Sequence, residues 1–218
     1  MTIDVKFFKV YTNKNARARA AREGSWGSFR TKSQGLLQKY VRPSKRLNWN
    51  PGARGVHVLA GVGAGKVLLW EYIDGRRWSG TVAAEMYKGA VRESLRRTYP
   101  KKRPWEILED SDPTGFRSKA GMAAKTDVGI QVLEIPKRSP QLNVCDYALW
   151  KGIEHRMQRQ EKRFAPSFRE SRKAFLGRLR RTAKRLPSTF INSSLKNMRI
   201  RCNRLLDAKG GHIEECGR

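Results

Sequence analysis

Two stretches decide the fold of this chain: WEILEDSDPTGFRS at 105–118 and IQVLEIPKRSPQLNVCDYALW at 130–150. Each begins with a short apolar run, which predicts a buried strand, and each then becomes polar around its prolines, which indicate a loop. The helix that we expect between them, at 118–128, begins with Ser118 as its N-cap. Strand, crossover helix and strand in this order predict two parallel neighbours in one sheet.

The rest of the sequence extends this pattern in both directions. The other expected elements are strands at 2–11, 56–62 and 66–73, and helices at 81–99, 146–163, 167–185 and 188–208. We expect the strands at 56–62 and 66–73 to form a hairpin. One or two further short strands are expected within 12–55. This order predicts an α/β fold, a mixed sheet of about five strands flanked by helices. We divide the chain into a core, 1–163, and basic C-terminal helices packed on it, 164–218.

The charge of the chain predicts a polyanionic partner. The 218 residues contain 47 Lys and Arg against 19 Asp and Glu, a net charge of +28. Nucleic acid is the commonest polyanion that such a protein binds. A ribosome-associated RNA binder and a merely solvated basic surface remain open on this observation. The net charge is +10 in residues 1–50, +5 in 51–150 and +13 in 151–218, so the acidic residues gather in the middle.

Cysteine usage and hydropathy favour an intracellular, soluble protein with no membrane partner. Three cysteines are too few and too odd a number for a disulfide framework. Cys202, His212 and Cys216 lack a fourth ligand, which disfavours a structural zinc site. No apolar stretch reaches membrane-spanning length.

Three aspartates fall at positions where an α/β sheet gathers ligands. Asp4 lies in the first strand, Asp110 closes the strand before its loop, and Asp146 begins a helix. Carboxylates that converge in this way repel one another, and two Mg²⁺ or Mn²⁺ ions would relieve the repulsion and clamp a phosphodiester. The alternative is that Asp110 caps its loop and Asp146 caps its helix. The residue pattern alone leaves both open.

The spacing of these motifs resembles the mariner-like branch of the DDE transposases. In that family a strand ends in Asp-Asn-x-Pro, and a later Ser-Pro-Asp-Leu-Asn-Pro leads to an acidic residue and a tryptophan. The matching residues here are Asp110, Pro113, Ser139, Pro140, Leu142, Asn143, Asp146 and Trp150. The two acids stand 36 residues apart, within the family's spacing class. The departures from the family pattern are Ser111, Gln141 and Val144.

The resemblance implies a ribonuclease H-like catalytic domain that cleaves DNA and transfers strands with two Mg²⁺ or Mn²⁺ ions. Asp4, followed by Phe7 and Phe8, fits the family's first carboxylate and would bridge both metals, while Asp110 and Asp146 would each hold one. DNA is the implied partner, and a homodimer in the active complex is an option. The implied location is the nucleus in a eukaryote and the cytoplasm otherwise.

Basic residues near these acids are candidates for nucleic-acid binding. Lys137 and Arg138 precede Asp146, and Arg117 follows the Asp110 loop. They would contact phosphates beside the scissile bond, or they are simply solvated. Further along, Arg178, Arg180, Arg181, Lys184 and Arg185 are expected to supply unspecific affinity for the DNA backbone.

The beginning of the sequence supports a second hypothesis. Only three residues precede Asp4, and the family's upstream region that recognises transposon ends has no counterpart here. A truncated or domesticated relic would keep the fold and the charge and would bind nucleic acid without catalysis. Whether the chain is an enzyme therefore stays undecided at the level of sequence.

Overall fold

The computed structural model describes residues 1–11, 55–136 and 139–208. One or two short strands were expected within 12–55, and all of that stretch except Gly55 lies outside the described residues. Five strands form one mixed sheet in the order β3-β2-β1-β4-β5. Their bounds are Thr2–Lys9 (β1), Gly55–Gly63 (β2), Lys66–Ile73 (β3), Trp105–Leu108 (β4) and Ile130–Leu133 (β5). The predicted mixed five-stranded sheet is therefore confirmed.

The sheet has an antiparallel half and a parallel half that meet at β1. β2 pairs antiparallel with both β1 and β3, and the predicted hairpin is confirmed. Its turn contains Ala64 and Gly65, with φ angles of 47° and 70°, a conformation that glycine adopts without steric penalty. β1 pairs parallel with β4, and β4 pairs parallel with β5. The helix between the last two strands makes the crossover that a parallel pair requires.

The helices agree with the expected order and differ from it at their ends. Their bounds are Gly80–Met86 (α3), Arg92–Thr98 (α4), Lys119–Asp127 (α5), Trp150–Lys162 (α6), Arg172–Lys184 (α7) and Ser188–Asp207 (α8). A π-helical turn, Tyr87–Val91, joins α3 to α4, so the single helix expected there is continuous but wider in the middle. Another π-helical turn, Cys145–Leu149, precedes α6.

Local capping explains two of the observed helix starts. Ser118 caps α5 as predicted, because its Oγ accepts a hydrogen bond from the amide of Gly121 at 3.0 Å. α7 begins later than expected, after Ser171, whose Oγ accepts from the amide of Ala174 at 3.1 Å. Residues 164–171 are therefore a connection and not part of the helix.

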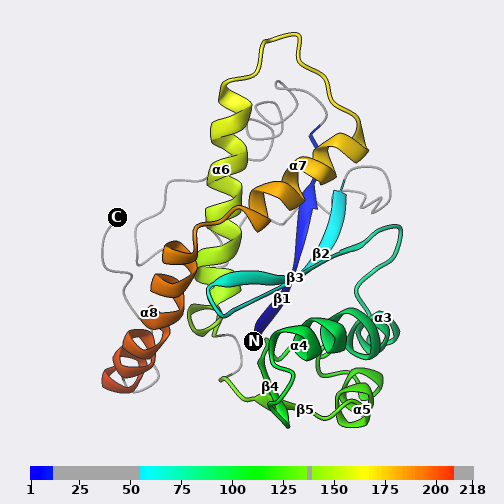
Figure 1. The fold of residues 1–218 in the computed structure, drawn as a ribbon, viewed down its shortest axis with the longest axis vertical. Coiled ribbons are helices and arrows are strands. Elements are labelled where there is room, and N and C mark those ends of the chain that lie inside the picture. The colour runs from blue at the N-terminus through cyan, green and yellow to red at the C-terminus, as the bar shows by residue number, and fades with distance from the viewer. Residues whose placement is uncertain (12–54, 137–138, 209–218) are drawn as a thin grey trace, which may run out of the picture.

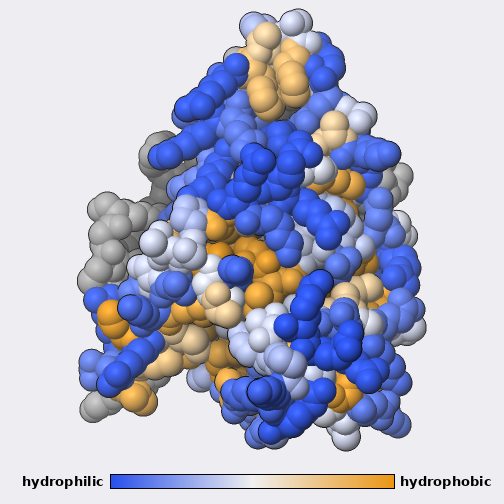
Figure 2. Space-filling model, viewed as in Figure 1, coloured by the Kyte–Doolittle hydropathy of each residue, from blue (hydrophilic) through white to orange (hydrophobic). Residues whose placement is uncertain are grey.

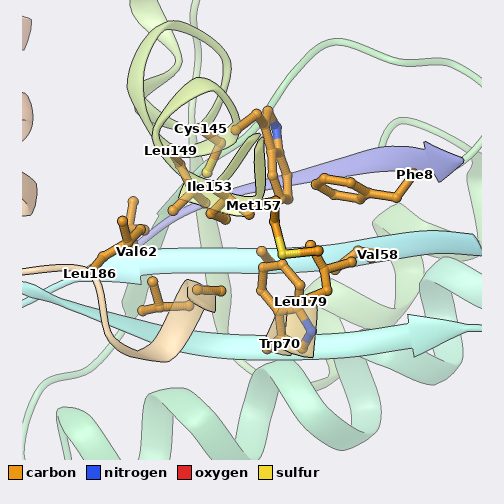
Figure 3. Close-up of a cluster of buried hydrophobic side chains, with 14 of the residues drawn as sticks. Phe8, Val58, Val62, Trp70, Cys145, Leu149, Ile153, Met157, Leu179 and Leu186 are labelled. Carbon is orange, nitrogen blue, oxygen red and sulfur yellow. The ribbon is translucent and has the colours of Figure 1, made fainter. Parts of the chain in front are cut away.

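Helices cover both faces of the sheet, and each face has its own hydrophobic core. α6, α7 and α8 lie on one side and α3, α4 and α5 on the other (Figure 1). On the α6 side, Phe8, Trp70, Ile153, Met157 and Leu179 gather between the strands and the helices (Figure 3). This cluster contains residues from both sides of position 163, so the C-terminal helices share a core with the sheet.

No helix in the described parts of the chain is long and apolar enough to cross a membrane.

Candidate active site

The pairing of β1 with β4 brings the first two predicted acids to neighbouring positions. Thr2 pairs with Leu108, and the amide of Leu108 donates to the carbonyl of Met1 at 3.0 Å. Asp4 and Asp110 each stand two residues beyond this pair, and the two strands run the same way. Asp110 is not in the strand as predicted, because β4 ends at Leu108. It begins the loop that follows.

The third acid, Asp146, lies in the π-helical turn before α6, and a buried asparagine holds this turn against β1. Asn143 Nδ2 donates to the carbonyl of Ile3 at 3.4 Å, and Asn143 Oδ1 accepts from the amide of Cys145 at 2.9 Å. Cys145 Sγ also contacts the carbonyl of Thr2 at 3.7 Å. The Ser-Pro-x-Leu-Asn motif is thus a docking element that carries Asp146 to the strand holding Asp4.

Asp4 and Asp146 interact directly inside the protein. Asp4 is 8% exposed and accepts a hydrogen bond from Trp150 Nε1 at 2.6 Å. Burial, and then the charge of Asp146, raises the pKa of Asp4 to about 7. Burial also raises the pKa of Asp146, which shares a side-chain hydrogen bond with Asp4 and feels the charge of Asp110. Two carboxylates this close disfavour ionising together.

Asp110 is the outer member of the three. Its Oδ1 accepts a hydrogen bond from the amide of the next residue, Ser111, at 2.6 Å. Asp146, by contrast, does not cap α6, since no side chain caps either that helix or the preceding turn. Within the described residues, no three His, Cys, Asp or Glu side chains are placed to surround one ion.

The nature of these donors nevertheless suits a hard divalent cation. All three are carboxylates, the ligands that Mg²⁺ and Mn²⁺ prefer. Burial and mutual repulsion raise the pKa values of Asp4 and Asp146, and a cation between them would remove that repulsion. The residues present therefore fit a divalent metal at this edge of the sheet.

A cleft of about 630 Å³ opens beside the acids. Asp4 and Asp110 line it together with Arg77, Trp78 and His57. His57 lies in β2 of the hairpin. The structure places it on the wall of the cleft, where its ring packs on Phe7 with centroids 5.1 Å apart. Burial lowers the pKa of His57, which favours the neutral imidazole.

Asp112 is a site residue that sequence reasoning missed. It accepts hydrogen bonds from the amides of Thr114 and Gly115 at 3.0 and 3.1 Å, and from Trp78 Nε1 at 3.0 Å. Its carboxylate therefore closes the loop that starts at Asp110 and ties it to the segment before α3. The signal was the Asp-Pro-Thr-Gly sequence, a composition typical of a turn closed by an aspartate.

A buried ion pair under the same loop was also missed. Glu109 and Lys125 are both almost inaccessible to solvent and pair with each other. Tyr87 donates its hydroxyl to Glu109, and Lys125 Nζ donates to the carbonyl of Phe116 at 2.8 Å. Burial raises the pKa of Glu109 and lowers that of Lys125. The pair therefore fixes Glu109, the residue before Asp110, and Phe116, near the other end of the Asp110 loop.

The predicted phosphate-binding residues remain candidates. Arg117 is described, and its Nη1 lies 3.1 Å from Glu134 Oε1, with 22% of its side chain exposed. Lys137 and Arg138 lie outside the described residues, as do His212 and Cys216 of the disfavoured zinc site.

Solved structures match this fold across nearly the whole chain. A Mos1 transposase paired-end complex with the left transposon end superposes with a TM-score of 0.68 and 16% identity, covering 98% of this chain and 56% of that one. The catalytic domain of Mos1 mariner transposase gives 0.63 and 12% identity, covering 98% and 84%. This chain has the fold of a mariner transposase catalytic domain. The predicted ribonuclease H-like fold is thereby confirmed.

The mariner transposase fold is shared at low sequence identity. A structure of the Mos1 catalytic domain with Raltegravir and Mg gives a TM-score of 0.64 at 11% identity, covering 98% of this chain and 85% of that one. No protein-family model and no curated protein sequence matches the chain. The chain spans 56% of the length of the transposase chain in the paired-end complex.

The Trp150–Asp4 hydrogen bond gives a first testable prediction. Trp150→Phe should lower the free energy of unfolding by about 2 kcal/mol, because a buried carboxylate loses its donor. The measurement is urea denaturation in EDTA, repeated with Asp4→Ala and with the double variant. The coupling between the two changes should be about 1 kcal/mol or more. Strictly additive effects would show that the hydrogen bond contributes nothing.

Proposed function

We propose that the chain is a DNA transposase catalytic domain that cleaves phosphodiester bonds and transfers strands with divalent metal ions. The contact between buried Asp4 and Asp146, at the edge where β4 delivers Asp110, carries this proposal. The matched structures support it, since they include Mos1 transposase with a transposon end and Mos1 catalytic domain with Mn or Mg.

Each acid has a distinct part in the proposed mechanism. Asp4, buried and held by Trp150, is fixed in orientation and would hold divalent metal together with Asp110 and Asp146. Two bound Mg²⁺ or Mn²⁺ ions would activate the attacking hydroxyl and stabilise the leaving oxygen. Asp4 and Asp110 line the cleft, so a DNA phosphate that enters it can approach them. The large positive charge of the chain attracts that DNA.

The competing hypotheses differ on these observations. The hypothesis of a ribosome-associated protein predicts no convergence of carboxylates, whereas Asp4 and Asp146 share a hydrogen bond. A non-catalytic relic predicts the same fold and charge as an enzyme, and only an assay separates them.

Metal-dependent nicking is the direct test of the proposal. The purified chain should convert supercoiled plasmid to nicked circles in Mg²⁺ or Mn²⁺ and should leave it intact in EDTA, because the acids alone supply no electrophile. Gel analysis of plasmid topology measures the rate. Strong DNA binding with no nicking in either metal would contradict the proposal and establish the relic.

A further inference from the structure

Six arginines line a second cleft, between α6 and α7, away from the carboxylates. The cleft has a volume of about 470 Å³. Its arginines are Arg156, Arg159 and Arg163 from α6 and its C-cap, and Arg178, Arg181 and Arg185 from α7 and its C-cap. Both triplets follow the spacing i, i+3, i+7, which puts each on one helical face. Gln160 Nε2 donates to Thr182 Oγ1 at 3.2 Å and links the two helices at the cleft.

Two of these arginines are used within the protein. Arg178 pairs with Glu161 and Glu170, with only 11% of its side chain exposed. Arg156 donates to the carbonyl of Gly152 at 3.3 Å and lies over the Phe190 ring. Their interactions fix the walls of the cleft.

The other four arginines are exposed and lack an acidic partner among the described residues. Arg159, Arg163, Arg181 and Arg185 make no ion pair within residues 1–11, 55–136 and 139–208. Hydrophilic residues cover most of the surface over α6 and α7 on the face shown in Figure 2. Like charges facing one another across a cleft repel, and a bound polyanion would relieve this repulsion. Guanidinium groups also match phosphate oxygens in a bidentate geometry.

The spacing of the four groups favours a chain of phosphates over a single anion. Arg159 and Arg163 are four residues apart, which corresponds to about 6 Å along a helix. Arg181 and Arg185 repeat this separation on the facing helix. A nucleic-acid backbone offers successive phosphates to both ends of such an array, whereas a single phosphate offers only one anionic group.

We propose that the α6–α7 arginine cleft is a separate binding site for the phosphate backbone of duplex DNA. The proposal rests on the proposed function, in which DNA is the substrate, and adds a contact remote from the acids. Arg159 stands 13 residues after Asp146, roughly 20 Å along the helix at about 1.5 Å per residue. That distance corresponds to about six base pairs of a duplex. The cleft would hold DNA well beyond the scissile phosphate.

The test compares two charge-matched double variants of the full chain. Arg159→Gln with Arg181→Gln removes two cleft charges, and Arg92→Gln with Arg97→Gln removes two exposed charges on α4. Affinity for a scrambled DNA duplex is measured by anisotropy in EDTA from 50 to 200 mM salt. Each lost phosphate contact lowers the slope of log K against log salt by about 0.9. The cleft variant should therefore lose about 1.8 from the slope, and the α4 variant less than about half of that.

A second cleft pair, Arg163→Gln with Arg185→Gln, removes the other two exposed charges of the same cleft and should give the same loss. Circular dichroism and thermal unfolding check the fold, and the melting temperature of each folded cleft variant should be unchanged or higher. Equal slopes for the cleft and α4 variants would overturn the proposal. A decrease of the slope that occurs with RNA duplexes and not with DNA duplexes would also overturn it. So would a rise in the parent's melting temperature that is as large with pyrophosphate as with DNA.

The assay separates this proposal from the proposed catalytic function. Binding in EDTA does not depend on metal at the carboxylates. A chain that never nicks DNA can still show the cleft effect, and a chain with active carboxylates can lack it.

Discussion

Asp110→Ala should reduce metal-dependent nicking by on the order of a thousandfold or more, because loss of a metal ligand removes about 4 kcal/mol of transition-state stabilisation. Asp4→Ala and Asp146→Ala should have effects of the same size. The affinity for DNA should stay equal or rise slightly, since each change removes a negative charge beside the phosphate. Plasmid nicking rates in Mn²⁺ and anisotropy in EDTA measure the two quantities separately.

The matched control for these variants is Asp127→Ala. Asp127 ends α5 and forms an exposed ion pair with Lys88 at 2.8 Å, an interaction worth little to stability. The Asp127→Ala substitution removes the same charge at a position away from the cleft. It should leave the nicking rate within about twofold of the parent rate. Calorimetry adds an independent measurement. Undiminished Mg²⁺ or Mn²⁺ binding by the triple alanine variant would rule out the assignment of these acids as ligands.

Much of the sheet could be predicted because its signals are local. The hairpin at 56–73 has apolar runs on both sides of a glycine turn, and its pairing needs no information from elsewhere in the chain. The strand–helix–strand order from 105 to 135 similarly specifies a parallel pair. The ends of elements were less predictable. β4 ends at Leu108, and the next residue, Glu109, forms the buried ion pair with Lys125.

The parts of the site that were missed depend on contacts between distant residues. Lys125 looks like an ordinary solvated lysine of an amphipathic helix, and only tertiary packing places it against Glu109, 16 residues earlier. The arginine cleft is of the same kind. The basic residues of α7 were recognised in the sequence as candidates for contacts with the DNA backbone. The matching basic face of α6 was not considered there. That expectation also included Arg178, whose charge is neutralised by Glu161 and Glu170.

The second large effect should come from that buried lysine. Lys125→Met should lower the free energy of unfolding by about 3–5 kcal/mol, because it leaves the Glu109 carboxylate buried without its partner. The carbonyl of Phe116 loses its donor at the same time. Urea denaturation in EDTA, followed by tryptophan fluorescence, measures the change. Lys119→Met, on the exposed first residue of the same helix, should cost less than about 0.5 kcal/mol.

A second substitution separates loss of charge balance from loss of packing. In Lys125→Met with Glu109→Gln, the uncompensated charge is gone, and at least about half of the lost stability should return. Because Glu109 and the carbonyl of Phe116 bracket the loop that starts at Asp110, the single variant should also nick DNA more slowly at temperatures where it stays folded. Denaturation of Lys125→Met at the same urea concentration as the parent would show that the buried pair does not hold this loop.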